Sequence, residues 1–343
     1  MEIRQAIHKL VRREHLTQAE SRLVMEQIMS GAATPAQIGA YLTALRMKGE
    51  TVDEIAGAVE VMRHKAQTIT VMQKAGDPPM IDTCGTGGDH VGTFNISTAT
   101  ALVVAACGVR VAKHGNRSIS SQSGSADVLK QLGVNIDANA RTVCQCIEQI
   151  GIGFLFAPNH HSAMRHALAP RQEIGIRTLF NLLGPLINPA QVRQQMIGVF
   201  DGEWLVPIAK VLQRLGSTRA LVVHGEDGLD EITTTAATKI AELQLNGEIL
   251  CYTVTPEQFG LPIAQQADLI GGTPELNAAI LHEVLNNTPG PKRDIVALNS
   301  GAALYIAGRA NTIPAGITLA LAALADGRAH HKLTELIDWS HKT

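Results

Sequence analysis

The chain has 343 residues, which is enough for one large domain or two smaller ones with well-buried cores. Its 29 Lys and Arg residues nearly balance 31 Asp and Glu residues, so the formal net charge of −2 argues against a polycationic nucleic-acid binder. Hydrophobic residues at 45% indicate a folded protein, and aromatic residues at 3% are too few for stacking platforms on single-stranded nucleic acid.

The N-terminal part of the chain shows helical patterns throughout. Apolar residues within 3–11 recur at the i, i+3, i+4 spacing of an amphipathic helix. Capping boxes predict further helices, because Thr17, Thr34 and Thr51 are each followed three residues later by Glu or Gln. We therefore expect a small helical bundle over residues 1–70.

The pattern changes after residue 79. A short strand is predicted over 80–84, a glycine-rich turn over 85–88, a helix over 97–107 and a second strand over 109–113. This order is that of a βαβ unit, which places its two strands in parallel in one sheet. The alternation continues, with strands expected at 134–136, 153–156, 195–200, 220–224, 239–243 and 249–253 and helices at 125–132, 141–150, 274–286, 294–307 and 313–325.

The stretch 159–189 is helical and has no strand pattern, so we expect it to fold back onto the N-terminal helices. The expected fold class is α/β with a small all-helical domain, and the larger domain has a mainly parallel sheet flanked by helices. The expected boundaries are 1–70 together with roughly 160–185 for the helical domain, and 75–160 together with 186–343 for the α/β domain.

A glycine-rich loop, Gly85–Asp89, follows the first predicted strand, and the polar residues Thr93, Asn95, Ser97 and Thr98 stand at the start of the next helix. Glycines let the backbone expose its N–H groups, and the helix N-terminus adds a positive dipole end at the same place. The loop has neither the Gly-Lys-Ser/Thr of a Walker loop nor the Gly-x-Gly-x-x-Gly fingerprint. We interpret it as a phosphate-binding loop, with a tight turn that caps a helix as the alternative.

A cationic loop lies just past the strand predicted at 109–113. From residue 109 to residue 125, Arg110, Lys113 and Arg117 occur among five serines and without any acid. Ligands of open α/β sheets bind at the carboxyl ends of parallel strands. We therefore predict a second anion-binding segment here, rather than a solvated surface loop with charges of both signs.

An acidic pair, Asp230 and Glu231, follows the strand predicted at 220–224. Carboxylates together with substrate phosphates are the usual ligands of Mg²⁺. Such a pair alone is typical of a surface turn, but the two anion-binding segments upstream favour a metal site.

The helical stretch adds two adjacent histidines, His160 and His161, and Arg171. Two histidines suggest a metal site, but no third ligand stands at a suitable spacing, so general-base and packing roles stay open. Arg171 is a candidate for bidentate recognition of a carboxylate, with a surface salt bridge as the alternative.

These four segments, in this order and spacing, resemble those of the anthranilate phosphoribosyltransferase family, which has the nucleoside-phosphorylase-like (class III/IV) phosphoribosyltransferase fold. The matching motifs are Gly85-Thr-Gly-Gly-Asp89, Phe94-Asn-Ile-Ser-Thr98, Lys113-His-Gly-Asn-Arg117 and Arg177-Thr-Leu-Phe-Asn-Leu-Leu-Gly-Pro-Leu-Ile-Asn-Pro189. The resemblance implies transfer of the phosphoribosyl group of 5-phosphoribosyl 1-pyrophosphate to the amine of anthranilate. The products are N-(5-phosphoribosyl)anthranilate and pyrophosphate, at an early step toward tryptophan.

The resemblance also assigns site residues by position. Those that would hold phosphoribosyl pyrophosphate are Gly85, Gly88, Asp89, Thr93, Asn95, Ile96, Ser97, Thr98, Lys113, His114, Gly115, Asn116, Arg117, Ser118, Ile119, Ser120, Ser121 and Ser125. Mg²⁺, with about two ions per monomer, would be bound by Ser97, Asp230 and Glu231. Anthranilate would contact Gly85, Asn116 and Arg171, with Arg171 facing its carboxylate. The family further implies a homodimer joined through the helical domain.

The implied chemistry requires no covalent nucleophile. Loss of pyrophosphate from the ribose C1 leaves positive charge on the sugar and negative charge on the leaving group, which Mg²⁺ and the cationic loop can stabilise. An aryl amine is neutral and nucleophilic at pH 7, so no catalytic side chain is assigned. Catalysis then rests on electrostatics and on positioning two substrates between two domains.

Other functions compete with this interpretation. A pyrimidine nucleoside phosphorylase has a similar fold and glycine loop and uses free phosphate, whereas the motif 113–117 and the acidic pair favour a Mg-pyrophosphate substrate. A non-enzymatic nucleic-acid-binding relative of the same fold should carry excess positive charge, which the net charge of −2 does not provide. A Rossmann oxidoreductase is weaker still, because its dinucleotide fingerprint is missing.

Sequence features also bear on location. The longest apolar stretch, around 101–108, is far too short to cross a bilayer, and the N-terminus lacks the pattern of a secretory signal. The five cysteines fit neither a disulfide framework nor a zinc site. We therefore expect a cytoplasmic protein with no membrane partner and no nucleic-acid partner.

Overall fold

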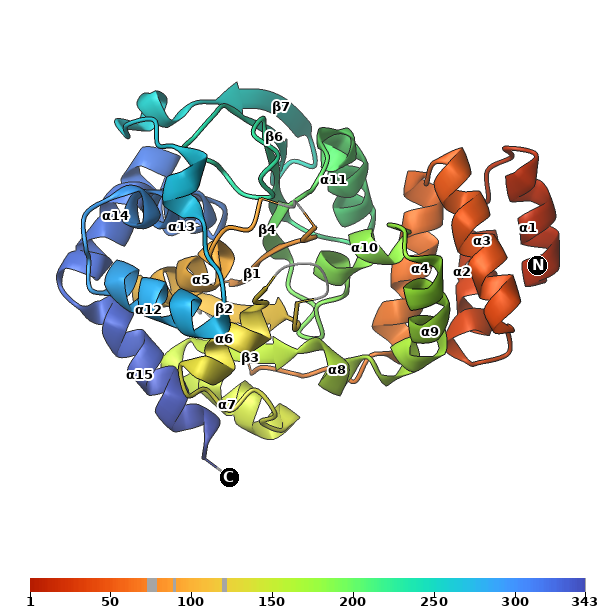
Figure 1. Ribbon diagram of the computed structural model, residues 1–343, viewed down its shortest axis with the longest axis horizontal. Helices are drawn as coiled ribbons and strands as arrows, with labels where there is room; N and C mark the ends of the chain where they lie inside the picture. The colour runs from red at the N-terminus through yellow and green to blue at the C-terminus, as the bar shows by residue number, and fades with distance from the viewer. Residues whose placement is uncertain (73–78, 89–90, 119–121, 343) are drawn as a thin grey trace.

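The structure is a computed structural model that describes residues 1–72, 79–88, 91–118 and 122–342. A helical bundle at the N-terminal end lies beside a larger α/β body (Figure 1). The bundle contains α1 (Ile3–Val11), α2 (Gln18–Met29), α3 (Pro35–Lys48) and α4 (Val52–Lys65). The predicted capping boxes are confirmed, because Thr17, Thr34 and Thr51 each accept a hydrogen bond from the backbone N–H three residues later.

A seven-stranded sheet, counted over the described residues, forms the centre of the larger body, in the order β3-β2-β1-β4-β5-β6-β7. The strands are β1 (Met80–Gly85), β2 (Arg110–Gly115), β3 (Ile152–Phe156), β4 (Gln194–Gly198), β5 (Arg219–Gly225), β6 (Thr238–Leu243) and β7 (Ile249–Val254). The strands from β3 to β5 pair in parallel, and β6 and β7 extend the sheet antiparallel. The expected mainly parallel sheet is confirmed.

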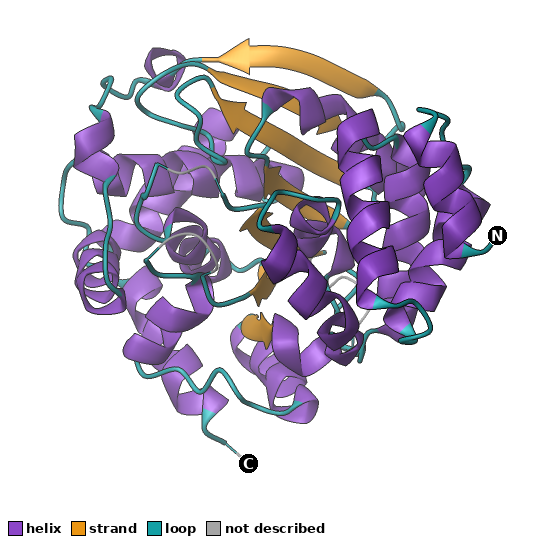
Figure 2. Ribbon diagram, turned by 45° about the vertical axis from the view of Figure 1, so that its right-hand side comes forward, coloured by secondary structure: helices purple, strands orange, loops and turns teal. Residues whose placement is uncertain are grey.

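Helices cover both faces of this sheet (Figure 2). Strand side chains alternate between the faces, so that Met196 joins one apolar core and its neighbour Ile197 joins another. The helices that contribute to the core on the Met196 face include α5 (Ile96–Ala106), α6 (Ser125–Gln131), α12 (Pro274–Leu285), α13 (Pro291–Ile306), α14 (Ile313–Ala325) and α15 (Arg328–Ser340). The second core includes residues of α11 (Leu205–Arg214) and of the N-terminal bundle, and α7 (Ala140–Ile150) packs on β3. Among the described residues no helix is both long and apolar enough to cross a membrane.

The strand predicted at 134–136 is wrong. Val134 and Ile136 are buried, but the segment is an irregular connection that is held to α15, where Asn135 N–H donates to Ser340 Oγ at 2.9 Å. Its apolar–polar–apolar alternation therefore reflects packing and not strand pairing. The helices α11 and α15 were not predicted, although the apolar residues of α11 recur at helical spacing.

The segment between β3 and β4 contains α8 (Ala157–His160), α9 (Arg165–Ile174) and α10 (Phe180–Leu183) and no strand among its described residues. α9 packs against α3 and α2 of the bundle. A backbone hydrogen bond of 2.8 Å, from Gln67 N–H to the His160 carbonyl, ties the chain after α4 to α8. The segment thus returns to the N-terminal helices before it enters β4.

Candidate active site

The glycine-rich loop and the acidic pair meet at the carboxyl edge of the sheet. β1 ends at Gly85, and the backbone N–H of Gly87 donates a hydrogen bond of 2.8 Å to Asp230 Oδ2. A Cβ at Gly198 of β4 would overlap the Asp230 backbone, and a Cβ at Gly85 would displace the Asp230 carboxylate from its place. The two glycines are therefore required by the close approach of Asp230, which joins two segments 143 residues apart.

The acidic loop that carries Asp230 and Glu231 is held in shape by its own polar residues. Thr233 Oγ1 donates to Asp227 Oδ2 at 2.6 Å, and Thr235 donates to the same oxygen. Directly after the acidic pair, the buried Asn299 of α13 donates to the Ile232 carbonyl at 2.8 Å and accepts from the Ile232 N–H at 3.0 Å. These contacts fix the backbone on both sides of the acidic pair.

The polar residues at the start of α5 lie beside the cationic loop. Asn95 does not cap its own helix with its side chain. Instead its Nδ2 donates to the Ser123 carbonyl at 3.1 Å, while its Oδ1 accepts from Asn277 Nδ2 at 2.9 Å. The Thr98 hydroxyl is buried without a hydrogen-bond partner among the described residues. Asn95 thus ties the helix start to the end of the cationic loop.

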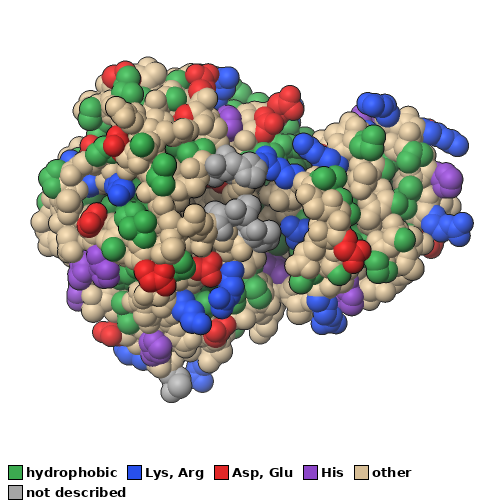
Figure 3. Space-filling view, in the orientation of Figure 1, with side chains coloured by type: hydrophobic (Ala, Val, Ile, Leu, Met, Phe, Trp, Pro, Cys, Tyr) green, Lys and Arg blue, Asp and Glu red, His purple; other side chains and the backbone are tan. Residues whose placement is uncertain are grey.

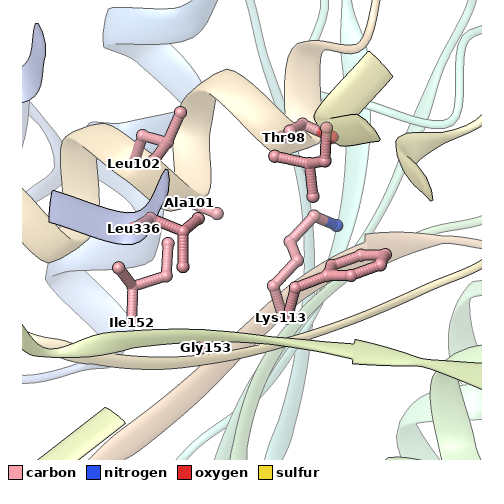
Figure 4. A pocket seen from close by; sticks show the side chains of 9 residues that line it. Thr98, Ala101, Leu102, Lys113, Ile152, Gly153 and Leu336 are labelled. Carbon is pink, nitrogen blue, oxygen red and sulfur yellow. The ribbon is translucent and has the colours of Figure 1, made fainter. Parts of the chain in front are cut away.

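Lys113 is buried and points from β2 across β1 toward the same helix start. Its Nζ donates to the Thr83 carbonyl at 2.5 Å and to Ser97 Oγ at 3.4 Å. Figure 4 shows the Lys113 amine turned toward Thr98, at the edge of a void of about 10 Å³ between α5, β3 and α15. The void has room for no more than about one water, so it is not a ligand site.

In the rest of the cationic loop, a neighbouring carboxylate partly neutralises the positive charge. Arg117 pairs with Asp127 at 3.5 Å, and Asp127 Oδ2 also accepts the backbone N–H groups of Ser118 and Gly124. Asn116 lies within the loop and its carbonyl accepts the Ala126 N–H at 3.1 Å. Arg110, in contrast, starts β2 at the opposite edge of the sheet and donates to the Met72 carbonyl, so it does not belong to the site.

A buried network that was not predicted supports these loops. Asp82 Oδ1 accepts the His114 backbone N–H at 3.2 Å, and Asp82 Oδ2 accepts Asn188 Nδ2 at 2.8 Å. Asn188 Nδ2 also donates to the Ala112 carbonyl at 2.9 Å. Burial raises the pKa of the Asp82 carboxyl, and the nearby Lys113 cation opposes that rise. The network joins β1 and β2 to the segment that precedes β4.

His114 and His161 form a second buried feature near this edge. Their ring centroids are 5.3 Å apart, and His114 Nδ1 lies 3.2 Å from the Gly184 carbonyl. Burial lowers the pKa of both rings, that of His161 to about 4, so both are neutral at pH 7. His114 Nε2 has no hydrogen-bond partner among the described residues, whereas a backbone hydrogen bond at Ile187 partly offsets the effect of burial on the His161 pKa. His160 is different, because its Nδ1 lies 2.8 Å from the Gln67 carbonyl.

Two arginines of the segment before β4 face aromatic rings. The Arg171 guanidinium of α9 lies 5.0 Å from the Phe180 ring centroid, and burial lowers its pKa. Arg177, which the sequence singled out only as part of a motif, donates to the Gly88 carbonyl and lies 4.4 Å from the Phe200 ring centroid. Arg177 therefore joins this segment directly to the glycine-rich loop.

A hollow separates the bundle from the larger body, and Lys and Arg side chains gather on its helical side (Figure 3). The structure thus brings together the glycine-rich loop, the start of α5, the residues 113–118 and the acidic pair. Four predicted site residues lie outside the described residues, namely Asp89, Ile119, Ser120 and Ser121.

The oxygen donors at this edge suit Mg²⁺ only in combination with other ligands. The described residues contain no group of three or more His, Cys, Asp or Glu side chains that could hold a metal alone. Asp230 and the largely buried Glu231 are hard oxygen donors, and Asp230 also accepts the Gly87 N–H of the glycine-rich loop. Mg²⁺ usually combines one or two carboxylates with substrate phosphates, so this site fits an ion that arrives with a phosphorylated substrate.

Comparisons with known proteins define the class first. Residues 4–66 match the helical bundle domain of a glycosyl transferase family, and residues 77–330 match its a/b domain. The chain is therefore a transferase of this family.

Individual relatives define the protein family further. A curated anthranilate phosphoribosyltransferase of Alkaliphilus metalliredigens is 52% identical over 340 residues, which cover 99% of both chains. The crystal structure of the enzyme from Thermus thermophilus has a TM-score of 0.92 at 43% identity and covers 98% of this chain and 99% of that one. The enzyme from Saccharomyces cerevisiae in complex with PRPP and Mg has a TM-score of 0.89 at 27% identity, with 98% and 97% covered. The chain belongs to the anthranilate phosphoribosyltransferase family.

Proposed function

We propose that the protein transfers the phosphoribosyl group of phosphoribosyl pyrophosphate to the amine of anthranilate, releasing pyrophosphate, in tryptophan biosynthesis. The observation that carries this proposal is the bond from Gly87 N–H to Asp230. This bond joins the glycine-rich loop to a carboxylate at one edge of the sheet, which supports binding of a phosphorylated substrate together with Mg²⁺ there. The family membership supports the same reaction.

Phosphoribosyl pyrophosphate would bind along the carboxyl edge of the sheet. The glycine-rich loop and the hydroxyls at the start of α5 would contribute to the site, and residues 113–118, with Ser125, complete the set. Mg²⁺, as about two ions per monomer, would be held by Ser97, Asp230 and Glu231 together with substrate oxygens. When bound, Mg²⁺ supplies positive charge to the leaving pyrophosphate.

Anthranilate would lie between this edge and the helical bundle. Gly85 and Asn116 stand on the sheet side, and Arg171 stands on α9 with a guanidinium suited to a carboxylate. The neutral, buried pair His114 and His161 lies near the same edge, and His114 Nε2 has no partner among the described residues. The neutral histidines therefore suit the uncharged aromatic ring of anthranilate, and Arg171 suits its carboxylate.

No side chain is assigned as a covalent nucleophile. Cys84, at the end of β1, is the nearest thiol to the glycine-rich loop, and burial raises its pKa well above the usual value, so it stays protonated. The chain's own contribution is to bind both substrates, to exclude water from the oxocarbenium-like sugar and to stabilise the leaving charge.

The direct test is the loss of anthranilate fluorescence when phosphoribosyl pyrophosphate is added with and without Mg²⁺. The proposal requires Mg²⁺-dependent loss of fluorescence together with release of pyrophosphate. Phosphorolysis of thymidine in place of that reaction, or a salt-dependent shift of nucleic acid in a gel, would overturn it in favour of the phosphorylase or the nucleic-acid binder.

We propose a homodimer formed through the helical bundle and a cytoplasmic location. Val11 of α1 and Met47 of α3 are large apolar side chains that are 64% and 72% exposed, and α1 and α3 pack side by side. The five cysteines are free, as in a reducing compartment. Light scattering of the protein and of a Met47→Lys variant tests the dimer, because only a bundle interface would dissociate in the variant.

A further inference from the structure

Arg177 lies outside the expected set of site residues and yet touches the phosphate-binding loop. It follows Gly175, which ends α9 in the left-handed conformation at φ 65°. Its guanidinium donates to the Gly88 carbonyl and stacks 4.4 Å from the Phe200 ring centroid, just past β4. Two separate contacts thus fix the orientation of a long side chain, which loses considerable conformational entropy when it is ordered.

Each described residue of the loop after Gly85 has its own tether. The Thr86 hydroxyl accepts the Phe200 backbone N–H at 3.1 Å, Gly87 N–H donates to Asp230 at 2.8 Å, and the Gly88 carbonyl accepts from Arg177. The loop is therefore held between a carboxylate on one side and a guanidinium on the other.

The tethers matter because the loop consists largely of glycine. Gly87 and Gly88 have φ values of 67° and 77°, in the left-handed region that other residues rarely adopt. Glycine loses the most conformational entropy on ordering, so an untethered loop would incur that loss when the substrate binds. A loop ordered before binding retains more of its interaction energy as affinity.

We propose that Arg177 is a positioning residue that holds the glycine-rich loop in the shape that binds phosphoribosyl pyrophosphate. The inference rests on the proposed function and assigns the residue to one of the two substrates. Arg171, six residues earlier on α9, is placed with anthranilate instead. Lysine cannot replace Arg177 fully, because an ammonium lacks the planar face that stacks on Phe200.

The competing explanation is that Arg177 is a structural staple, that is, a residue that only stabilises the fold by joining two parts of the chain. A staple would lower stability and affect both substrates alike. Loop positioning predicts a selective effect on phosphoribosyl pyrophosphate, at nearly unchanged thermal stability. The ratio of the two KM values therefore separates the explanations.

The experiment compares Arg177→Lys and Arg177→Gln with Arg219→Lys as a matched control. Arg219 lies 4.4 Å from the Tyr305 ring centroid and donates to the Tyr305 carbonyl at 2.9 Å, but it starts β5 at the opposite edge of the sheet. We expect KM for phosphoribosyl pyrophosphate to rise about tenfold in Arg177→Gln and less in Arg177→Lys, as loss of one charged hydrogen bond implies. KM for anthranilate and the melting temperature should change little, and the Arg219 variant should change neither KM.

Calorimetric titration with phosphoribosyl pyrophosphate and Mg²⁺ gives a second readout that needs no turnover. Equal increases in both KM values together with a lower melting temperature would make Arg177 a staple and overturn the proposal, as would unchanged values in both variants. A wild-type protein that binds the substrate but forms no product would refute the proposed reaction alone, because the titration still tests Arg177.

Discussion

Asp230 shapes the candidate site through both its carboxylate and its backbone. The carboxylate accepts the Gly87 N–H, while the backbone carbonyl lies so close to Gly198 that no side chain fits there. A neutral amide at position 230 could keep the hydrogen bond but would remove the charge. The residue therefore allows the electrostatic part of the site to be tested separately from its shape.

Asp230→Asn and Glu231→Gln should each raise the Mg²⁺ concentration needed for half-maximal activity, by about tenfold, because each change removes the charge of a carboxylate that we propose as a Mg²⁺ ligand. The measurement is initial rate against Mg²⁺ concentration. Glu226→Gln is the control, since Glu226 is in the same loop but forms an exposed ion pair with Lys239 at 3.2 Å. Full activity of both site variants at low Mg²⁺ would contradict the assignment.

Arg171→Ala should weaken anthranilate binding far more than phosphoribosyl pyrophosphate binding, by about tenfold or more, because it removes the cation assigned to the carboxylate. Calorimetric titration with each substrate measures the two effects. Arg165→Ala, at the exposed start of α9, serves as the control on the same helix. Equal weakening for both substrates would count against a role at the anthranilate carboxylate.

The buried histidine pair makes stability depend on pH. The folded-state pKa of His161 is about 4, chiefly because of burial, whereas an unfolded histidine titrates near pH 6.5. Below about pH 6.5 the unfolded chain therefore takes up the proton first, and stability falls as the pH drops toward 4. In His161→Asn the free energy of unfolding should therefore fall less between pH 7 and pH 4 than in the wild type, by an amount on the order of 2 kcal/mol.

Urea unfolding at several pH values between 4 and 7 measures that slope. His331→Asn provides the control, because the His331 side chain is 72% exposed. Parallel pH profiles for wild type and His161→Asn would show that the buried ring does not titrate as its surroundings imply.

At the scale of elements, the local sequence pattern predicted the helices and strands well, but it did not predict contacts between residues far apart in the chain. The helix start at Thr51 and the first βαβ unit depend on neighbours in the chain, and both are confirmed. The apolar–polar alternation at 134–136 is also local, but the segment packs on α15, about 200 residues away. The alternation therefore led to the wrong prediction of a strand. Likewise nothing near Asn188 reveals that it binds Asp82, 106 residues earlier. The candidate site was predictable as loops at strand ends, but not as a network.

Asn188→Ala tests how far the segment before β4 depends on that network. The change leaves the buried Asp82 carboxylate and the Ala112 carbonyl each without one donor. We expect the free energy of unfolding to fall by about 1 to 3 kcal/mol, as for buried acceptors that lose a hydrogen-bond donor. Denaturant unfolding measures the loss, with Asn246→Ala as control because its bond to Glu248 is exposed. A loss no larger than that of the control would contradict the proposed importance of the pair.

At the scale of the whole molecule, the helical bundle and the α/β body share one apolar core. Leu45 of α3 and Val59 of α4 belong to the same buried cluster as Ile197 of β4 and Val222 of β5. We propose that 1–70 with 160–185 forms one unit and that 75–160 with 186–343 forms the other. A shared core of this kind couples the folding of the two units even where a hollow separates them at the surface (Figure 3).

This coupling predicts a single unfolding transition. Arg63 of α4 donates to the Leu186 carbonyl at 2.7 Å, and Arg214 of α11 binds Asp53 of α4, so polar contacts reinforce the shared core. Scanning calorimetry should give one peak whose calorimetric and van't Hoff enthalpies agree. Arg63→Gln should lower the melting temperature by about 2 °C and leave the peak single, because the apolar core still joins the units. Two resolved peaks in the wild type would show that the bundle unfolds independently, and a peak that splits only in Arg63→Gln would assign the coupling to that hydrogen bond instead of the core.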